Sequence, residues 1–279
     1  MLINNYHTHT KYCGHAKGDV EDYVKEALNL NMEELGISDH APIPLNHGMT
    51  KEEWEENYCY ENMDINTFDN LLKEIDNLKS KYNIKLYKGC ESEYLYNNDD
   101  WYKELRCKLD YMILGIHFFN GEGRVLDTYK DINYKNVDCY YECAKRAIET
   151  GLFDYLAHPD LYLFDYKSIN GKNEFDAKAK EICLKLIDLC VKHDIYFEIN
   201  TNGLKYSKDK NNRELWLYPN IEFFKVVKEY MDKNPNKLKL IIGADAHEPK
   251  ALGNDNVKAV LEMVKDLKLD VLNKMEIKW

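Results

Sequence analysis

Short apolar runs alternate with longer amphipathic segments along the chain. We predict strands at seven places: 2–7, 34–40, 84–94, 110–119, 153–159, 195–202 and 239–247. Apolar residues at i, i+3 and i+4 spacing predict helices over 19–31, 65–82, 136–151, 179–194, 221–233 and 254–269. Asp19 stands where the N-cap of the first helix is expected. Strands that alternate with helices in this way predict a parallel α/β fold.

Seven strand–helix units without an interruption favour one β/α barrel, slightly short of the usual eight units. The chain has 279 residues, a length that single barrels reach, and it contains no linker rich in Gly, Pro or Ser and no internal repeat. We therefore expect one domain over residues 1–279. Segments 41–64 and 118–136 are the least regular, and we expect them to be loops over one face of the barrel.

The overall charge and the start of the chain limit the class of protein. A formal net charge of −11 argues against a dedicated nucleic-acid surface, which would need a basic face. It still allows a phosphorylated substrate, because a metal cluster can supply positive charge locally. The start, MLINNYHTHT, lacks the pattern of a signal peptide, and no stretch approaches about 18 consecutive apolar residues. We expect a cytoplasmic protein without a membrane span.

Eight cysteines are present without a C-x-x-C pair. In a chain without a signal peptide we expect reduced thiols that serve as small apolar residues. Cys13 and Cys90 lie beside candidate metal ligands and are the exceptions to follow.

Polar side chains gather at the carboxyl-terminal ends of the predicted strands. In chain order they are His7, His9, Asp39, His40, Glu91, Glu93, His117, His158, Glu198, Asn200, Asp245 and His247. Seven of the nine histidines fall at these ends or, like His15, in the first loop, and only His47 and His193 do not. Parallel barrels build their active sites at this end of the strands.

This set of side chains predicts a multinuclear metal site. His7 and His9 are two residues apart, which puts both rings on one face of a strand. The imidazoles and carboxylates together exceed what one tetrahedral zinc ion can use. They suit two or three ions, with Glu91 or another carboxylate bridging. Imidazole plus carboxylate without thiolate favours Zn²⁺, Fe²⁺ or Mn²⁺.

The motifs at the strand ends resemble the successive motifs of the PHP (polymerase and histidinol phosphatase) family. They are HTH at 7–9, YCGHA at 12–16, SDHAP at 38–42, GCESE at 89–93, GIHF at 115–118, AHPDL at 157–161, EINTNGL at 198–204 and GADAH at 243–247. The likeness runs from Tyr6 to His247. It is closest to the histidinol-phosphatase branch, because YCGHA, SDHAP and EINTNGL are similar to the signatures of that branch. The family fold is a distorted seven-stranded β/α barrel, which agrees with the seven strands counted here.

The resemblance implies three metal sites. The implied ligands are His7, His9, Glu91 and Asp245 for the first site, Glu91, His117 and His158 for the second, and His15, His40 and His247 for the third. All nine positions carry the residue type that the family pattern requires.

The resemblance also implies hydrolysis of a phosphate monoester, and the expected reaction is that of histidine biosynthesis, in which L-histidinol phosphate and water give L-histidinol and phosphate. Two cations about 3.5–4 Å apart bridge a water, lower its pKa and direct it at phosphorus in line with the leaving group. A third ion would neutralise another phosphate oxygen or the leaving alkoxide. We expect Glu91, Asp245 and His247 to take part in catalysis, with Asp245 able to relay a proton from the water.

Recognition of the phosphate away from the metals calls for a cation, and Lys205 and Arg124 are the candidates. Glu93, Asp160 and Glu198 have two interpretations. They could meet the ammonium and imidazolium groups of a cationic substrate, or they could form hydrogen bonds at the strand ends. The sequence leaves the oligomeric state and the alcohol portion of the substrate open.

Other functions fit parts of the pattern. The nearest is a PHP phosphoesterase that acts on another small phosphate ester or on nucleotide or nucleic-acid ends, although the acidic charge and the lack of polymerase segments disfavour an exonuclease. An amidohydrolase barrel also starts with H-x-H, but it would want eight strands and a single Asp at the last strand, and Glu91 and the Asp245–His247 pair disagree with it. A non-catalytic metal-binding module would saturate each ion, whereas nine ligands around three ions leave positions for water and phosphate.

Overall fold

The computed structural model describes residues 2–42, 63, 65–95, 98–121 and 123–277. The parallel strands are β1 (Asn4–Asn5), β2 (Glu34–Ile37), β3 (Lys85–Lys88), β4 (Glu91–Ser92), β5 (Ile113–Leu114), β8 (Tyr155–Leu156), β9 (Tyr196–Asn200) and β10 (Lys239–Gly243). They form a three-stranded sheet in the order β1-β2-β3 and a five-stranded sheet in the order β4-β5-β8-β9-β10. The order in space follows the order in the chain, so the predicted parallel α/β class is confirmed.

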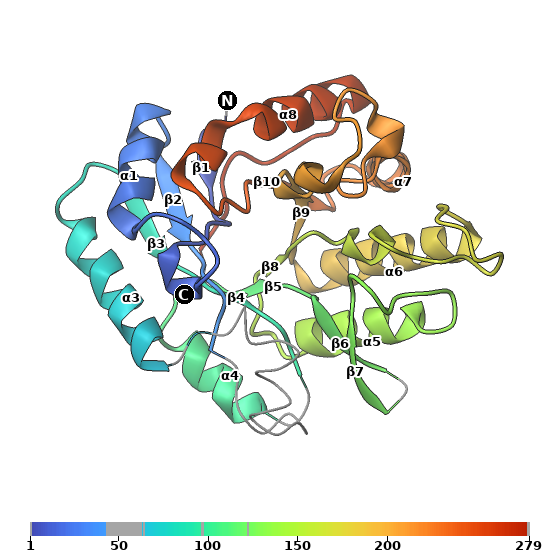
Figure 1. Ribbon diagram of the computed structural model, residues 1–279, viewed down its shortest axis with the longest axis horizontal. Coiled ribbons are helices and arrows are strands. Elements are labelled where there is room, and N and C mark those ends of the chain that lie inside the picture. Colours follow the sequence, from blue (N-terminus) through green and yellow to red (C-terminus); the bar gives the residue numbers. More distant parts are fainter. Residues whose placement is uncertain (1, 43–62, 64, 96–97, 122, 278–279) are drawn as a thin grey trace.

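Helices surround these strands, and in Figure 1 they follow one another around the outside of the molecule. They are α1 (Val20–Asn29), α3 (Ile65–Lys79), α4 (Asp99–Arg106), α5 (Val137–Glu149), α6 (Ala177–His193), α7 (Ile221–Lys233) and α8 (Asp255–Leu267). The six predicted helices are confirmed. At the start of α1, Asp19 and Asp22 form a capping box that satisfies backbone donors of the first turn. None of the helices in the described residues is long and apolar enough to cross a membrane.

The predicted strand 84–94 is divided between the two sheets. Its first part, β3, pairs with β2, and its second part, β4, pairs with β5. Gly89 lies between the two parts, and a side chain there would collide with the ring of Tyr111, which packs against the backbone. The division therefore accompanies a close approach of an aromatic ring to the chain.

Isolated parallel bridges connect the two sheets. One joins His40 to Glu91, and the other joins Thr8 to Ala246. Residues that follow β1 therefore lie beside residues that follow β10, although the two segments are near opposite ends of the chain.

Two elements differ from the sequence-based expectation. Within 118–136, expected to be a loop, β6 (Phe118–Gly121) and β7 (Arg124–Asp127) form an antiparallel hairpin. Helix α4 was not predicted, because its sequence DDWYKELR is polar and shorter than the window of about 11 residues in which helical periodicity becomes visible. Most of the other expected loop, 41–64, lies outside the described residues.

Apolar side chains form two separate clusters. The larger one combines the inner faces of the helices with residues of the strands. The smaller one, which we call the tyrosine cluster, consists of Tyr6, Tyr87, Tyr111, Ile113, Tyr155, Ala157, Tyr196, Ile241 and Met275. Met275 belongs to the C-terminal segment, and its backbone N–H donates to the Tyr6 hydroxyl at 3.2 Å. The N–H of Leu272 donates to the carbonyl of Leu240 at 2.8 Å, and the N–H of Glu276 donates to the Tyr196 hydroxyl at 2.7 Å. Several hydrogen bonds thus tie this segment to the strands.

Candidate metal centre

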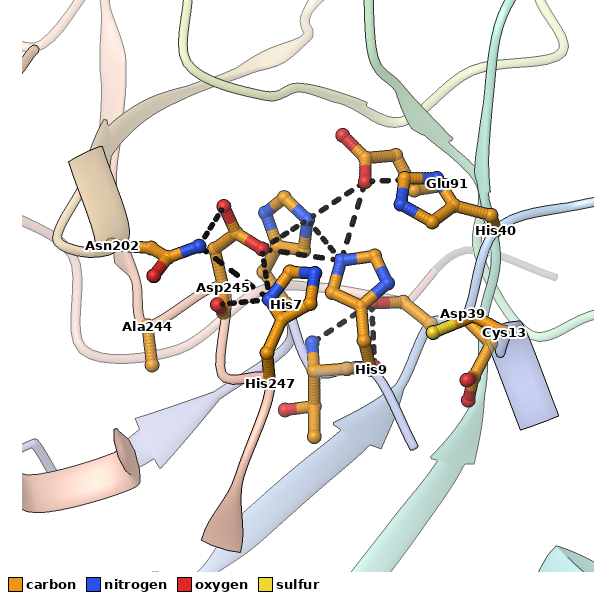
Figure 2. A network of polar contacts seen from close by, with 12 residues as sticks. His7, His9, Cys13, Asp39, His40, Glu91, Asn202, Ala244, Asp245 and His247 are labelled. Atoms are coloured by element: carbon orange, nitrogen blue, oxygen red, sulfur yellow. Dashed lines mark hydrogen bonds and ion pairs between the residues drawn. The ribbon is translucent and has the colours of Figure 1, made fainter. Parts of the chain in front are cut away.

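Side chains from three different parts of the chain converge on the first predicted site (Figure 2). His7 Nε2 lies 3.1 Å from His9 Nε2 and 3.2 Å from Glu91 Oε2. His9 Nε2 lies 3.3 Å from Glu91 Oε2 and 3.2 Å from Asp245 Oδ1. Ligand atoms around a tetrahedral zinc ion are about 3.3–3.4 Å apart, since the bonds are about 2.0–2.1 Å long. These four buried atoms therefore fit around one divalent cation.

Glu91 also faces the second predicted site. Its Oε1 lies 2.9 Å from His158 Nε2 and 3.6 Å from His117 Nε2, whereas its Oε2 faces His7 and His9. One carboxylate thus presents an oxygen to each group of histidines. This is the geometry expected of a carboxylate that bridges two metal ions.

The third group centres on His247. Its Nε2 lies 3.0 Å from His15 Nε2, and the Nδ1 atoms of the two rings face backbone carbonyls of Asp245 and Cys13. With the protons on Nδ1, two lone pairs face each other, and this arrangement calls for a cation between them. A nitrogen of His40 lies within 4.8 Å of ligand atoms of His9 and His247. The ring centroids of His15 and His40 are 5.2 Å apart, so the third predicted set of ligands is also brought together.

Two buried carboxylates accept hydrogen bonds from predicted ligand rings, at the ring nitrogen that faces away from the other ligands. Glu198 Oε1 accepts a hydrogen bond from His7 Nδ1 at 2.8 Å, and Glu93 Oε1 accepts one from His117 Nδ1 at 2.7 Å. A carboxylate in this position fixes the orientation of a metal-bound imidazole and raises its basicity. The geometry therefore favours the hydrogen-bonding interpretation of Glu93 and Glu198. The hydrogen-bonding interpretation also fits Asp160, since its Oδ2 accepts from the backbone N–H of Asn220 at 2.6 Å.

Asparagine and tyrosine partners complete the surroundings of the carboxylates. Asp245 Oδ2 accepts from Asn200 at 3.1 Å and from Asn202 at 3.2 Å, which leaves Oδ1 to face His9. The Tyr155 hydroxyl donates to Glu198 Oε1 at 2.8 Å. Sequence reasoning missed Asn202 and Tyr155. Asn202 belongs to the EINTNGL motif, which could have indicated it, whereas Tyr155 lies in an apolar run that carries no such signal.

Asp39 anchors the loop that carries His15. Its Oδ1 accepts from the backbone N–H of Thr10 at 2.7 Å, and the Thr10 hydroxyl donates to the same carboxylate. Gly14 adopts a φ of +83° immediately before His15, a conformation that glycine reaches without strain. Asp39 is thus a support of the site rather than a ligand.

Two of the ligands have a left-handed backbone. The φ angles are +28° for His158 and +46° for Asp245. Such a conformation costs about 1–3 kcal/mol in a residue other than glycine and persists only where the surroundings enforce it. Part of that enforcement is the hydrogen bond from the His158 N–H to Glu198 Oε2 at 2.6 Å.

The carboxylates of the first predicted site favour a bound cation, whereas the surroundings of His247 in the third predicted site keep its ring neutral. Burial lowers the pKa of His7, but Glu198, Glu91 and Asp245 outweigh this effect and raise the pKa to about 10. Burial raises the pKa of Glu91, yet the neighbouring histidines hold it well below its usual value. Burial, together with His9, lowers the pKa of His247 to about 3. A divalent cation in the first group would therefore replace the proton of His7, whereas His247 is already neutral.

The two predicted phosphate-binding cations lie in different surroundings. Lys205 belongs to the 3₁₀ helix η4 (Asn202–Tyr206), which begins at a partner of Asp245, and its Nζ lies 4.8 Å from the centroid of the Tyr206 ring. Arg124 begins β7, at the end of the hairpin remote from Phe118, and its Nη2 lies 4.0 Å from Asp131 Oδ1. Both assignments stay predictions.

The remaining candidates take no ligand position. Cys13, Cys90, Cys107, Cys143, Cys183 and Cys190 are free thiols, as expected. Cys13 is buried, and its Sγ donates to the carbonyl of Thr10 at 3.1 Å. Burial raises the pKa of the Cys90 thiol. His193 lies at the end of α6, and His47 is outside the described residues.

Comparisons with known proteins agree with this geometry. A probable histidinol-phosphatase of Thermotoga maritima is 24% identical over 262 residues, which cover 94% of this chain and 90% of that protein. Among solved structures, a Listeria monocytogenes protein assigned to the histidinol phosphatases superposes with a TM-score of 0.71 at 21% identity and covers 91% of this chain and 99% of its own. The histidinol phosphate phosphatase of Lactococcus lactis, solved with zinc, L-histidinol and phosphate, gives a TM-score of 0.66 at 15% identity over 98% of this chain and 96% of its own.

The comparison with family patterns bears out the resemblance found in the motifs. Residues 5–202 match the PHP domain, and this span includes seven of the nine predicted ligands. Since the match covers well over half of the sequence, the chain belongs to the PHP domain family.

Proposed function

We propose that this protein is a metal-dependent phosphomonoesterase that hydrolyses L-histidinol phosphate to L-histidinol and phosphate. The observation that carries the proposal is the position of Glu91, with one oxygen toward His7 and His9 and the other toward His117 and His158. The relatives support the choice of substrate, because those named are histidinol phosphatases.

The nine predicted ligands would hold two or three divalent ions, and zinc, iron and manganese all suit imidazole and carboxylate donors. Bound ions would supply the positive charge that grips phosphoryl oxygens and that lowers the pKa of a water. The zinc in the Lactococcus lactis enzyme supports this donor set. Predicted ligands form three groups, and the ligand atoms within each group lie within 4.8 Å of one another. Three such groups support more than one ion.

The residues of the chain would prepare and complete the hydrolysis. Glu91, Asp245 and His247 are the proposed catalytic residues. Asp245 Oδ1 faces the first group while its other oxygen is held by two asparagines, so Oδ1 is placed to accept a proton from the attacking water. The water oxygen would bond to phosphorus as the ester P–O bond breaks, and the proton taken up by Asp245 would pass to the oxygen of the leaving alcohol. Lys205 and Arg124 remain the candidates for holding a phosphate oxygen away from the ions.

We also infer that residues 1–279 form one domain whose strands close into a distorted seven-stranded barrel. The bridge Thr8–Ala246 supports closure, since it links the segment after β1 to the segment after β10, and these are edge strands of the two sheets. The bridge His40–Glu91 links the segment after β2 to β4. The tyrosine cluster supports it as well, because its members come from strands all along the chain. Side chains from successive strands fill the interior of such barrels.

The test is to purify the chain without chelator, measure its metals by elemental analysis, and assay L-histidinol phosphate beside a panel of other phosphate monoesters and a nucleotide. We expect two to three ions per chain and the highest kcat/KM for L-histidinol phosphate. A metal content of one ion or fewer, unchanged by reconstitution with Zn²⁺, Mn²⁺ or Fe²⁺, would contradict the cluster. A higher kcat/KM for another ester would keep the phosphatase and change its substrate.

A further inference from the structure

A row of aromatic rings borders the second group of ligands. We call it the aromatic wall, and it consists of Tyr129, Phe164, Tyr206 and Tyr218. The ring of Tyr129 lies parallel to that of His117, with 4° between the planes and 6.1 Å between the centroids. The ring of Tyr218 lies 6.2 Å from that of His158. Two rings of the wall therefore neighbour two predicted metal ligands.

The rings of the wall contact one another in sequence. Phe164 lies 5.0 Å from Tyr129 and 6.2 Å from Tyr218, and Tyr206 lies 5.3 Å from Phe164. Tyr129 follows β7, and Phe164 follows η3 (Leu161–Leu163). Tyr206 is the last residue of η4, and Tyr218 precedes α7. Four segments distant in the sequence thus build one continuous aromatic surface.

The rings of the aromatic wall range from buried to exposed to solvent. Tyr218 is 2% exposed and Tyr206 is 43% exposed, while Tyr129 and Phe164 are half-buried. Rings that served only as core would be buried throughout. A molecule held at the metal ligands could therefore reach the rings from solvent.

Two of the three carboxylates that could otherwise recognise a cationic alcohol hold predicted ligand rings, whereas Asp160 Oδ1 has no hydrogen-bond partner among the described residues. Glu93 accepts from His117, and Glu198 accepts from His7 and from Tyr155. The aromatic faces favour a planar ring by stacking, and they also attract a ring that carries positive charge.

We propose that the aromatic wall receives the alcohol portion of the substrate and selects phosphomonoesters whose alcohol carries a planar ring. The proposal rests on the proposed function, since it takes the phosphoryl group to lie at the metal ligands. It extends that function, because an aromatic alcohol without an imidazole or an ammonium group should also be accepted.

The experiment compares three esters with the metal-reconstituted full chain: L-histidinol phosphate, 2-phenylethyl phosphate and propyl phosphate. Tyr206→Ala tests an exposed ring, and Phe164→Leu keeps the apolar volume while it removes the aromatic face. We expect each variant to raise KM for both ring esters about threefold to tenfold, as the loss of one aromatic pair predicts. For propyl phosphate we expect kcat and KM to stay within about twofold, since it has no ring to lose.

Tyr134→Ala is the matched control, because Tyr134 is an exposed tyrosine (37%) outside the wall. It should leave KM for all three esters unchanged. Equal changes for ring and propyl esters in the wall variants, or no change for any ester, would overturn the proposal.

A second measurement separates this proposal from the proposed function. If the fully loaded protein hydrolyses none of the esters, the phosphatase assignment fails, and binding of 2-phenylethanol is measured by saturation-transfer NMR. Weaker transfer to the aromatic protons with Phe164→Leu than with the unmodified chain supports the wall. Equal transfer overturns it.

Discussion

The strands carry two buried regions of opposite character. Strand β9 shows both, because Tyr196 belongs to the tyrosine cluster and Glu198, two residues later on the same face, supports His7. The tyrosine cluster buries neutral groups, and burial raises the pKa of phenols such as Tyr111. The metal centre, in contrast, buries ionised carboxylates, among them Glu91, whose pKa is held far below its usual value.

We expect the two regions to affect different properties of the protein, namely its stability on one side and its metal content and activity on the other. Buried neutral groups with hydrogen-bond partners contribute to stability under all conditions in which they stay neutral. Buried charges are costly unless they are paired or bind a cation. Changes in the tyrosine cluster should therefore act on the free energy of unfolding, whereas changes in the metal centre should act on metal content and activity.

The largest effect is expected for Glu91→Gln. An amide is a weaker and uncharged ligand, so the two groups of histidines would lose the carboxylate between them. We expect kcat/KM for the best ester to fall about a thousandfold, with fewer ions bound. Kinetics and elemental analysis check this. His193→Gln, at the end of α6, is the control and should behave like the unmodified chain.

Met275→Ala is the control for Glu91→Gln in the other region, because it should change stability and leave metal binding as it is. It opens a cavity in the tyrosine cluster and should lower the free energy of unfolding by about 2–4 kcal/mol in a urea titration. Its metal content should not change. If Met275→Ala lost ions as Glu91→Gln does, the two regions would not be separable.

The next effect is expected for His15→Ala. A monoester at neutral pH carries close to two negative charges, and a third ion is a direct way to match the second one. The variant should keep two ions per chain and lose about a hundredfold in kcat, and phosphate should inhibit it more weakly. A full metal complement with normal turnover would remove His15 from the ligands.

Sequence reasoning could expect the predicted ligands to lie together, because parallel strands place their carboxyl-terminal ends on one side and each end carries its own motif. It could not say which oxygen of Glu91 faces which histidine, because that depends on side-chain rotamers set by packing. It also missed the hairpin of β6 and β7, which is too short for a periodic signal. The aromatic wall had no sequence signature, since Phe164 and Tyr218 meet only through the folding of distant loops.

Metal binding should depend on pH in one part of the centre. His7 has a pKa of about 10 in the folded protein and must lose its proton to bind an ion. Hydrogen bonds, first of all to Asp245, outweigh burial and also hold the pKa of His9 well above its usual value. Because each of these rings must lose its proton to bind an ion, the apparent affinity of the first predicted site should rise at least tenfold per unit of pH between about pH 6 and 8. His247, with a pKa of about 3, is neutral throughout this range and should add nothing.

Calorimetry of the metal-free protein checks this dependence, with zinc titrated in two buffers of different ionisation enthalpy. At least one proton should be released when the first group fills. An affinity that stays constant between about pH 6 and 8 would show that the carboxylates do not hold a proton on His7.

The smallest effect concerns Tyr155, the member of the tyrosine cluster that touches both regions. Its hydroxyl donates to Glu198 Oε1 at 2.8 Å, and the same oxygen accepts from His7. Tyr155→Phe keeps the ring but leaves Glu198 with one donor fewer, so we expect a loss of about 1 kcal/mol in the free energy of unfolding. Because His7 is then held less firmly, metal affinity should also fall, by about threefold, in competition with a chelator of known affinity.

Tyr111→Phe is the matched variant for this prediction. The Tyr111 hydroxyl donates to the backbone carbonyl of Tyr6 rather than to a carboxylate of the metal centre. Its removal should cost a similar free energy of unfolding, about 1 kcal/mol, with no change in metal affinity. Equal metal affinities for the two variants would mean that Glu198 positions His7 without help from Tyr155. A lower affinity for Tyr155→Phe alone would identify this hydroxyl as the place where packing in one region supports chemistry in the other.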